Sequence, residues 1–215
     1  MKKQVDLVMF DLDGTLADTG RDLADAVNYT RAYFSLGPLT NEIVYSKVGR
    51  GIEYLLRHTL PDDSQLRFPE VMRVFLGHYE NHLLDTTVLY PNVQETLEFF
   101  RNKRRVVVSN KIARFTVAVL RGLGVEKQFD AILGGDSVTD KKPHPALLNK
   151  ALVRFNIAAT KAVMIGDGDI DVEAGKRAGV VTCGVTYGLG NKEDLIAAKP
   201  DFLIDHLSEL PEYFY

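Results

Sequence analysis

VMFDLDGTLADTG, residues 8–20, sets an apolar, strand-like run directly against two carboxylates, Asp11 and Asp13. Apolar runs of this kind are usually buried, and carboxylates in apolar surroundings are costly unless they are paired or bind a cation. The stretch therefore predicts a buried strand that ends at a site where negative charge is stabilised.

The composition is that of an ordinary globular protein. Its 215 residues suit one large domain or one domain with an insertion, and 46% are hydrophobic. The net charge of −3 gives no argument for nucleic acid or an anionic membrane as a partner. A single cysteine, Cys183, excludes an internal disulfide, and no run reaches the roughly 18 apolar residues of a membrane span. We expect a cytoplasmic protein, and the sequence leaves open a monomer or a homodimer.

The second half of the chain alternates between strand-like and helical patterns. This alternation predicts an α/β fold, a doubly wound Rossmann-like parallel sheet with helices on both faces. The expected strands are residues 5–10, 105–108, 129–133, 162–165 and 180–185, and the expected helices are 91–100, 115–121, 145–155 and 171–178.

Residues 16–84 carry only helical patterns, with apolar side chains recurring every three to four positions. We therefore expect an all-helical cap, residues 16–88, inserted into a core formed by residues 1–15 and 89–215. The hinges of this insertion should lie near residues 16–19 and 84–90.

Polar groups follow four of the predicted strands, and ligands bind beyond the carboxyl ends of strands in open parallel sheets. Taken alone, each group has an ordinary explanation as a turn, a helix cap or a solvated surface pair. Together they should meet at one edge, where clustered carboxylates repel unless a cation offsets them. The groups are Asp11 and Asp13, Ser109 and Asn110, Lys141 and Lys142, and Asp167, Asp169 and Asp171.

This set of residues fits phosphoryl transfer. Oxygen ligands in small number suit Mg²⁺, which often shares a phosphate, and Ser109 and Lys142 would hold that phosphate. Asp11 projects first from the strand and is the predicted nucleophile, and Asp13 is the predicted general acid and base. A P-loop is excluded because no G-x-x-x-x-G-K-[ST] occurs. A dinucleotide site is disfavoured because Asp171 stands where the third glycine should be.

Four segments in this order resemble the motifs of the haloacid dehalogenase superfamily: DLDGT at 11–15, VVVSN at 106–110, KKPHP at 141–145 and GDGDIDVEAG at 166–175. The resemblance implies Mg²⁺ ligands from Asp11, the backbone carbonyl of Asp13, and Asp167. It implies that Asp171 orients the metal waters or Lys142.

The same resemblance implies that phosphate is bound by Ser109, Lys142 and backbone amides near Asn110. Gly168 departs from the pattern, since many relatives carry Ser or Thr there. The presence of Asp13 argues against the dehalogenases and phosphonate hydrolases of the superfamily.

The helical insertion resembles the cap of one subfamily, and several segments of the chain resemble phosphoglycolate phosphatases. The implied substrate is a small phosphate ester, 2-phosphoglycolate. Arg50 and Gly51 lie in a stretch that resembles the cap loop facing the site. There Arg50 either pairs with a substrate carboxylate or is a surface arginine in a turn. A phosphosugar mutase or other phosphotransferase, a pyrophosphatase and a nucleotidase share this core and remain alternatives. A non-catalytic binding protein is disfavoured because every group that the chemistry needs is present.

Overall fold

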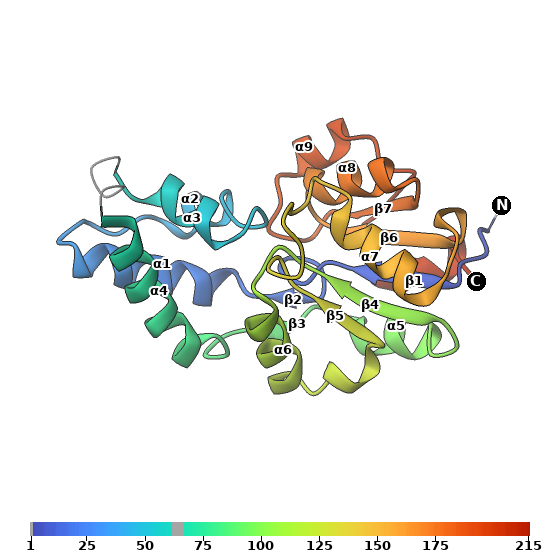
Figure 1. The fold of residues 1–215 in the computed structure, drawn as a ribbon, viewed down its shortest axis with the longest axis horizontal. Coiled ribbons are helices and arrows are strands. Elements are labelled where there is room, and N and C mark those ends of the chain that lie inside the picture. Colours follow the sequence, from blue (N-terminus) through green and yellow to red (C-terminus); the bar gives the residue numbers. More distant parts are fainter. Residues whose placement is uncertain (1, 62–66) are drawn as a thin grey trace.

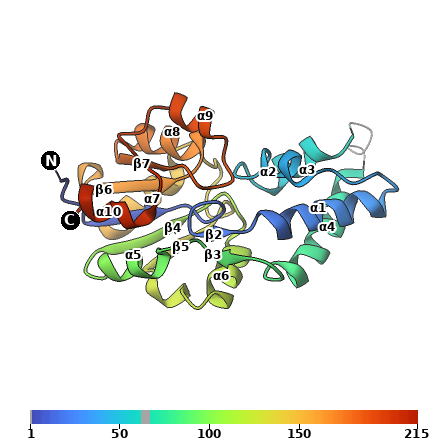
Figure 2. The ribbon, with the colours of Figure 1, turned by 180° about the vertical axis from the view of Figure 1, so that it is seen from behind.

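The computed structural model describes residues 2–61 and 67–215, so residue 1 of the predicted core and residues 62–66 of the predicted cap lie outside it. Within the described residues, a sheet with flanking helices lies beside a group of helices (Figures 1 and 2). Both ends of the chain lie at the end of the core that is far from these helices (Figure 1).

The core is built on a six-stranded parallel sheet, which confirms the predicted fold class. The central strand β1 pairs with β4 on one side and β6 on the other, with Phe10 opposite Val107 and Ile165. The strand order is β5-β4-β1-β6-β7-β8, with bounds Ala131–Leu133, Arg104–Val108, Leu7–Phe10, Ala162–Gly166, Val181–Val185 and Phe202–Ile204. The sequence did not predict β8.

Each face of the sheet is covered by helices. Side chains of β1 alternate between two hydrophobic clusters, with Val8 and Phe10 in one and Leu7 and Met9 in the other. A central strand buried on both faces is apolar at every position, which explains the uninterrupted run in the sequence. The first cluster includes residues of α5 (Val93–Phe99), α6 (Ala113–Gly122) and α10 (Leu210–Tyr213), and the second residues of α7 (Ala146–Phe155) and α8 (Asp169–Ala178). The remaining core elements are α9 (Lys192–Ala197) and the 3₁₀ helices Glu126–Gln128, Ala159–Lys161 and Leu207–Glu209.

Four helices make up the described part of the insertion: α1 (Gly20–Tyr33), α2 (Asn41–Tyr45), α3 (Ile52–Thr59) and α4 (Phe68–His82). The buried faces of α1 and α4 pack against each other, with Leu23 and Val27 in the same cluster as Phe75 and Tyr79. The Tyr79 ring also meets the edge of Phe115 in α6, at 5.4 Å between centroids. The apolar spacing in the sequence therefore marks the faces that hold these helices together. Among the described residues, no helix is long and apolar enough to cross a membrane.

The chain crosses between the two parts through a short antiparallel ribbon, β2 (Ala17–Asp18) paired with β3 (Val88–Leu89). The segment predicted as all-helical therefore starts with two strand residues, a correction to the prediction. Strands of two residues are too short to show a period in the sequence. Asp22, buried in α1, accepts hydrogen bonds from the backbone and hydroxyl groups of Thr86 and Thr87, which ties the outgoing chain to the returning one.

Candidate active site

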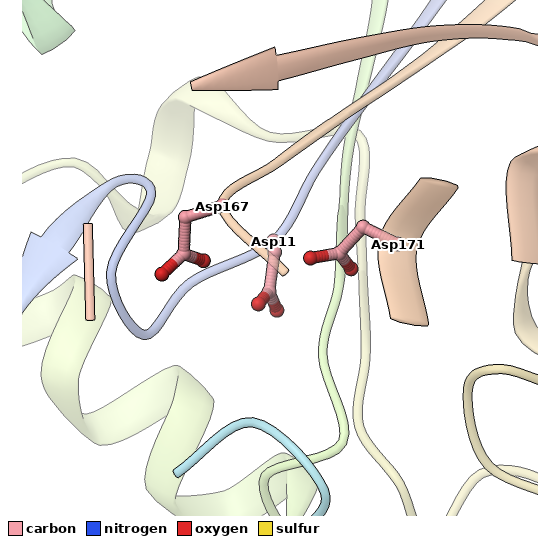
Figure 3. Close-up of side chains that lie close together, drawn as sticks. All are labelled: Asp11, Asp167 and Asp171. Carbon is pink, nitrogen blue, oxygen red and sulfur yellow. The ribbon is translucent and has the colours of Figure 1, made fainter. Parts of the chain in front are cut away.

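Three buried carboxylates meet at the carboxyl edge of the sheet (Figure 3). Asp11 follows β1, Asp167 follows β6, and Asp171 is the third residue of α8. Oxygen atoms of all three lie within 4.8 Å of one another. Because β1 and β6 are adjacent and parallel, the structure brings together the carboxylates that the sequence predicted there.

Lys142 lies among these carboxylates and is itself buried. Its Nζ donates to Asp171 Oδ1 at 2.7 Å and to the Val108 carbonyl at 2.8 Å, and it lies 2.9 Å from Asp11 Oδ1. Burial acts to lower the pKa of Lys142, but the negative charges of Asp11 and Asp171 outweigh it and raise that pKa. The lysine is therefore a fixed positive charge beside Asp11.

Burial makes the Asp11 carboxylate costly. Burial, opposed by the attraction of Lys142 and reinforced by the negative charges of Asp171, Asp167 and Asp13, raises the pKa of Asp11 to about 7. Although Lys142 is near Asp11 Oδ1, this oxygen has no hydrogen-bond partner among the described residues. Burial and the charge of Asp171 likewise raise the pKa of Asp167 to about 6.

The donor set fits a divalent cation. When ionised, Asp11, Asp167 and Asp171 carry three negative charges against the single charge of Lys142. Carboxylate oxygens suit hard cations such as Mg²⁺ and Ca²⁺. Both oxygens of Asp171 already accept hydrogen bonds, from Lys142 and from the amide of Gly168. Asp171 therefore holds Lys142 in place beside Asp11.

Gly14 allows the chain to turn tightly beneath Asp167. Its φ is +84°, and a Cβ atom there would lie 2.0 Å from Asp167 Oδ2 and 2.8 Å from the Leu189 amide. That amide and the amide of Gly190 donate to Asp167 Oδ2, each at 2.8 Å, and the Thr15 hydroxyl donates to Oδ1 at 3.1 Å. Gly14 therefore has two roles: it forms a turn, and it leaves room for the Asp167 carboxylate.

Ser109 and Asn110 follow β4, beside Asp11, and both are buried. The Asn110 side chain is fully engaged: Oδ1 accepts from the Lys142 amide, and Nδ2 donates to the carbonyls of Lys142 and Gly49. This side chain links the loop before α3 to the segment that carries Lys142. Any contact of Asn110 with phosphate is therefore expected through its backbone amide, and the phosphate role of Ser109 stays a prediction.

Asp13 is paired with a lysine that the sequence reasoning missed. Lys111 Nζ donates to Asp13 Oδ1 at 2.7 Å and Oδ2 at 3.0 Å, and the Thr19 hydroxyl donates to Oδ1 at 2.6 Å. Burial acts to lower the pKa of Lys111, but the charge of Asp13 outweighs it and raises that pKa. The available signal was its position directly after the Ser-Asn pair that ends β4.

Arg50 reaches the core but not the carboxylate cluster. Its Nη2 donates to Asp169 Oδ2 at 2.7 Å, and both side chains are about one-third exposed. Next to it, Gly51 has a φ of +92° and packs so closely that a Cβ would lie 3.3 Å from the Asn110 carbonyl. The loop faces the site as predicted, and a contact between Arg50 and substrate stays a prediction.

A cavity of about 240 Å³ opens between this loop and the carboxylates. Its walls bring the sheet edge and the insertion together. They include Asp11, Asp13, Asp167 and Asp171 from the core and Gly49, Arg50 and Tyr54 from the insertion. A ligand in it would contact both parts of the chain.

Comparison with known proteins agrees with this geometry. The haloacid dehalogenase-like hydrolase model matches residues 8–185. The chain is 35% identical to a phosphoglycolate phosphatase of Colwellia psychrerythraea over 97% of this chain and 96% of that one, and 35% identical to one of Haemophilus influenzae over 98% of both. The crystal structure of a predicted phosphoglycolate phosphatase from Haemophilus somnus superposes with a TM-score of 0.91 at 29% identity, over 97% of each chain. The chain belongs to the haloacid dehalogenase-like hydrolase family.

Proposed function

We propose that this protein is a Mg²⁺-dependent phosphatase that hydrolyses a small phosphate monoester, 2-phosphoglycolate, through an aspartyl-phosphate on Asp11. The observation that carries the proposal is the placement of Asp11, buried among the other carboxylates with its Oδ1 2.9 Å from the Lys142 ammonium. The substrate is supported by the full-length relatives named phosphoglycolate phosphatase.

In the first step, an oxygen of Asp11 attacks phosphorus, and the bond from phosphorus to the ester oxygen breaks. Asp13 gives its proton to the leaving oxygen, which departs as the alcohol. Lys142, fixed by Asp171, offsets negative charge on the phosphoryl oxygens, and Ser109 donates to one of them.

In the second step, Asp13 takes a proton from water, and the water oxygen attacks phosphorus. The bond from phosphorus to the Asp11 oxygen breaks, which releases orthophosphate and regenerates the carboxylate. Residues 16–88 would act as a cap that excludes bulk water while the acyl phosphate exists.

Asp11, Asp167 and the backbone carbonyl of Asp13 would hold Mg²⁺. When bound, Mg²⁺ neutralises charge on the transferring phosphoryl group. The raised pKa values of Asp11 and Asp167 are consistent with carboxylates that need such a cation at neutral pH.

A substrate screen with and without Mg²⁺ tests this proposal. Purified protein is given 2-phosphoglycolate, sugar phosphates, nucleoside monophosphates and pyrophosphate, and orthophosphate and organic products are measured. We expect Mg²⁺-dependent orthophosphate release, with 2-phosphoglycolate preferred and the Asp11→Asn variant inactive. An isomerised sugar phosphate without orthophosphate would instead identify a mutase. Full activity of the Asp11→Asn variant would remove Asp11 as the nucleophile.

A further inference from the structure

A second, much smaller cavity also has Asp13 in its wall. Its volume is about 20 Å³, close to the space that one water molecule needs. The insertion contributes the apolar side chains of Leu23, Val48, Ile52 and Leu55 and the backbone of Gly49 and Gly51. Within residues 2–61 and 67–215, the charged residues that line it are Asp13 and Lys111. A group that enters here must be small, and it meets one ammonium in apolar surroundings.

Lys111 is held in this place almost fully buried. Its side chain is 3% exposed, and its Nζ lies 5.1 Å from the centroid of the buried Tyr79 ring. Its Nζ donates hydrogen bonds to both oxygens of Asp13, the one carboxylate paired with it among the described residues. A buried ammonium is strongly destabilising without an anion, so Lys111 depends on this carboxylate.

The proposed reaction requires Asp13 to act on the leaving oxygen in the larger cavity, whose wall it also forms. To exchange a proton with the leaving oxygen, its carboxyl must turn toward the phosphorus bound at Asp11, and it cannot then keep both oxygens on Lys111. The ammonium would lose its anion at the moment when the substrate occupies the site. A second anion supplied by the substrate removes this cost.

We propose that Lys111 binds the carboxylate of the leaving group and is the residue that selects 2-phosphoglycolate. The inference rests on the proposed function and deepens it. The substrate carboxylate takes the place of Asp13 on Lys111, which frees Asp13 to act on the ester oxygen. The preferred esters are therefore phosphates of small 2-hydroxy acids, because the cavity is small and a single carbon separates the ester oxygen from the carboxylate.

Arg50 is another cation that lines the larger cavity, and its contacts favour Lys111 for this role. Arg50 lines the larger cavity and not the smaller one, and its guanidinium is already paired with Asp169. It is also 37% exposed, so water screens its charge. A carboxylate gains more from the buried ammonium.

The test compares 2-phosphoglycolate with 2-hydroxyethyl phosphate, in which a hydroxymethyl group replaces the carboxylate. The ratio of their kcat/KM values is measured for the unsubstituted protein, Lys111→Met, Arg50→Met and the surface control Lys127→Met. We expect Lys111→Met to lower this ratio by about 30-fold or more, since a hydrogen bond between charged groups is lost. Arg50→Met and Lys127→Met should each leave it within about threefold. An equal loss for both substrates in Lys111→Met would overturn the inference, because Lys111 would then only position Asp13.

A binding experiment covers the case in which Lys111→Met does not fold because Asp13 is left unpaired. Asp13→Asn removes that charge and silences turnover, so calorimetry can compare it with the double variant Asp13→Asn, Lys111→Met. The double variant should bind 2-phosphoglycolate about 30-fold more weakly and 2-hydroxyethyl phosphate equally well. Equal affinity of both proteins for 2-phosphoglycolate would contradict the inference. If the unsubstituted protein hydrolyses neither ester, the proposed function fails instead.

Discussion

Replacing Asp11 by asparagine should stabilise the metal-free protein at neutral pH while it removes the proposed nucleophile. Burial raises the pKa of Asp11 from its ordinary 3.8 to about 7. Between these values the folded protein keeps a proton that the unfolded chain has lost, so the free energy of unfolding falls as the pH rises through this window. The gap between 3.8 and about 7, at about 1.4 kcal/mol per pH unit, amounts to about 4 kcal/mol.

The Asp11→Asn variant cannot lose this proton. In EDTA, its free energy of unfolding should exceed that of the unsubstituted protein by about 4 kcal/mol at pH 8 and nearly equal it at about pH 4. Urea denaturation followed by circular dichroism across this range measures the difference. Asp169→Asn is the matched control, because it removes a carboxylate that is about one-third exposed. Parallel pH profiles for the unsubstituted protein and Asp11→Asn would refute the reasoning. Added Mg²⁺ should stabilise only the protein that retains Asp11.

Three further substitutions test other parts of the account. Lys142→Met leaves Asp11 and Asp171 without their buried cation, so the free energy of unfolding should fall by about 3–5 kcal/mol and kcat by at least about 10³-fold. An unchanged rate of phosphate release would show that Lys142 does not stabilise the transferring phosphoryl group. Gly14→Ala should weaken Mg²⁺ binding about tenfold, because the alanine Cβ would displace the Asp167 carboxylate. Calorimetry that shows unchanged Mg²⁺ affinity would count against Asp167 as a ligand. Asp22→Ala leaves the two donors of buried Thr87 and the two of exposed Thr86 without this acceptor, so it should cost about 3 kcal/mol in urea denaturation, with a smaller loss for Asp22→Asn. A loss below about 0.5 kcal/mol would show that these hydrogen bonds are unimportant for stability.

The parallel sheet could be predicted because its central strands are apolar at every position and alternate with amphipathic helices. Leu7 to Phe10 are all buried, and this burial on both faces is what the sequence run reflects. The ribbon of β2 and β3 could not be predicted in this way. Each of its strands has two residues, and their pairing depends on the insertion bringing Ala17 and Leu89 together.

The carboxylate cluster was predictable from the strand ends, since parallel neighbours place Asp11 and Asp167 side by side. The pairing of Asp13 with Lys111 was not. A lysine after a strand usually lies in solvent, whereas this one is buried, with its Nζ 5.1 Å from the centroid of the Tyr79 ring in α4. That contact joins residues far apart in the chain, and no local spacing encodes it. The ion pair of Arg50 with Asp169 likewise joins residues far apart in the chain, so local spacing does not encode it either.

The formation of an acyl phosphate on Asp11 is the step on which the proposed function depends. The protein with Mg²⁺ is mixed with 2-phosphoglycolate carrying a labelled phosphoryl group, quenched in acid within milliseconds, and digested for peptide mapping. We predict transient label in the peptide that contains Asp11, released by hydroxylamine as expected for an acyl phosphate. Orthophosphate release without any labelled protein, or label on another residue, would contradict the central claim.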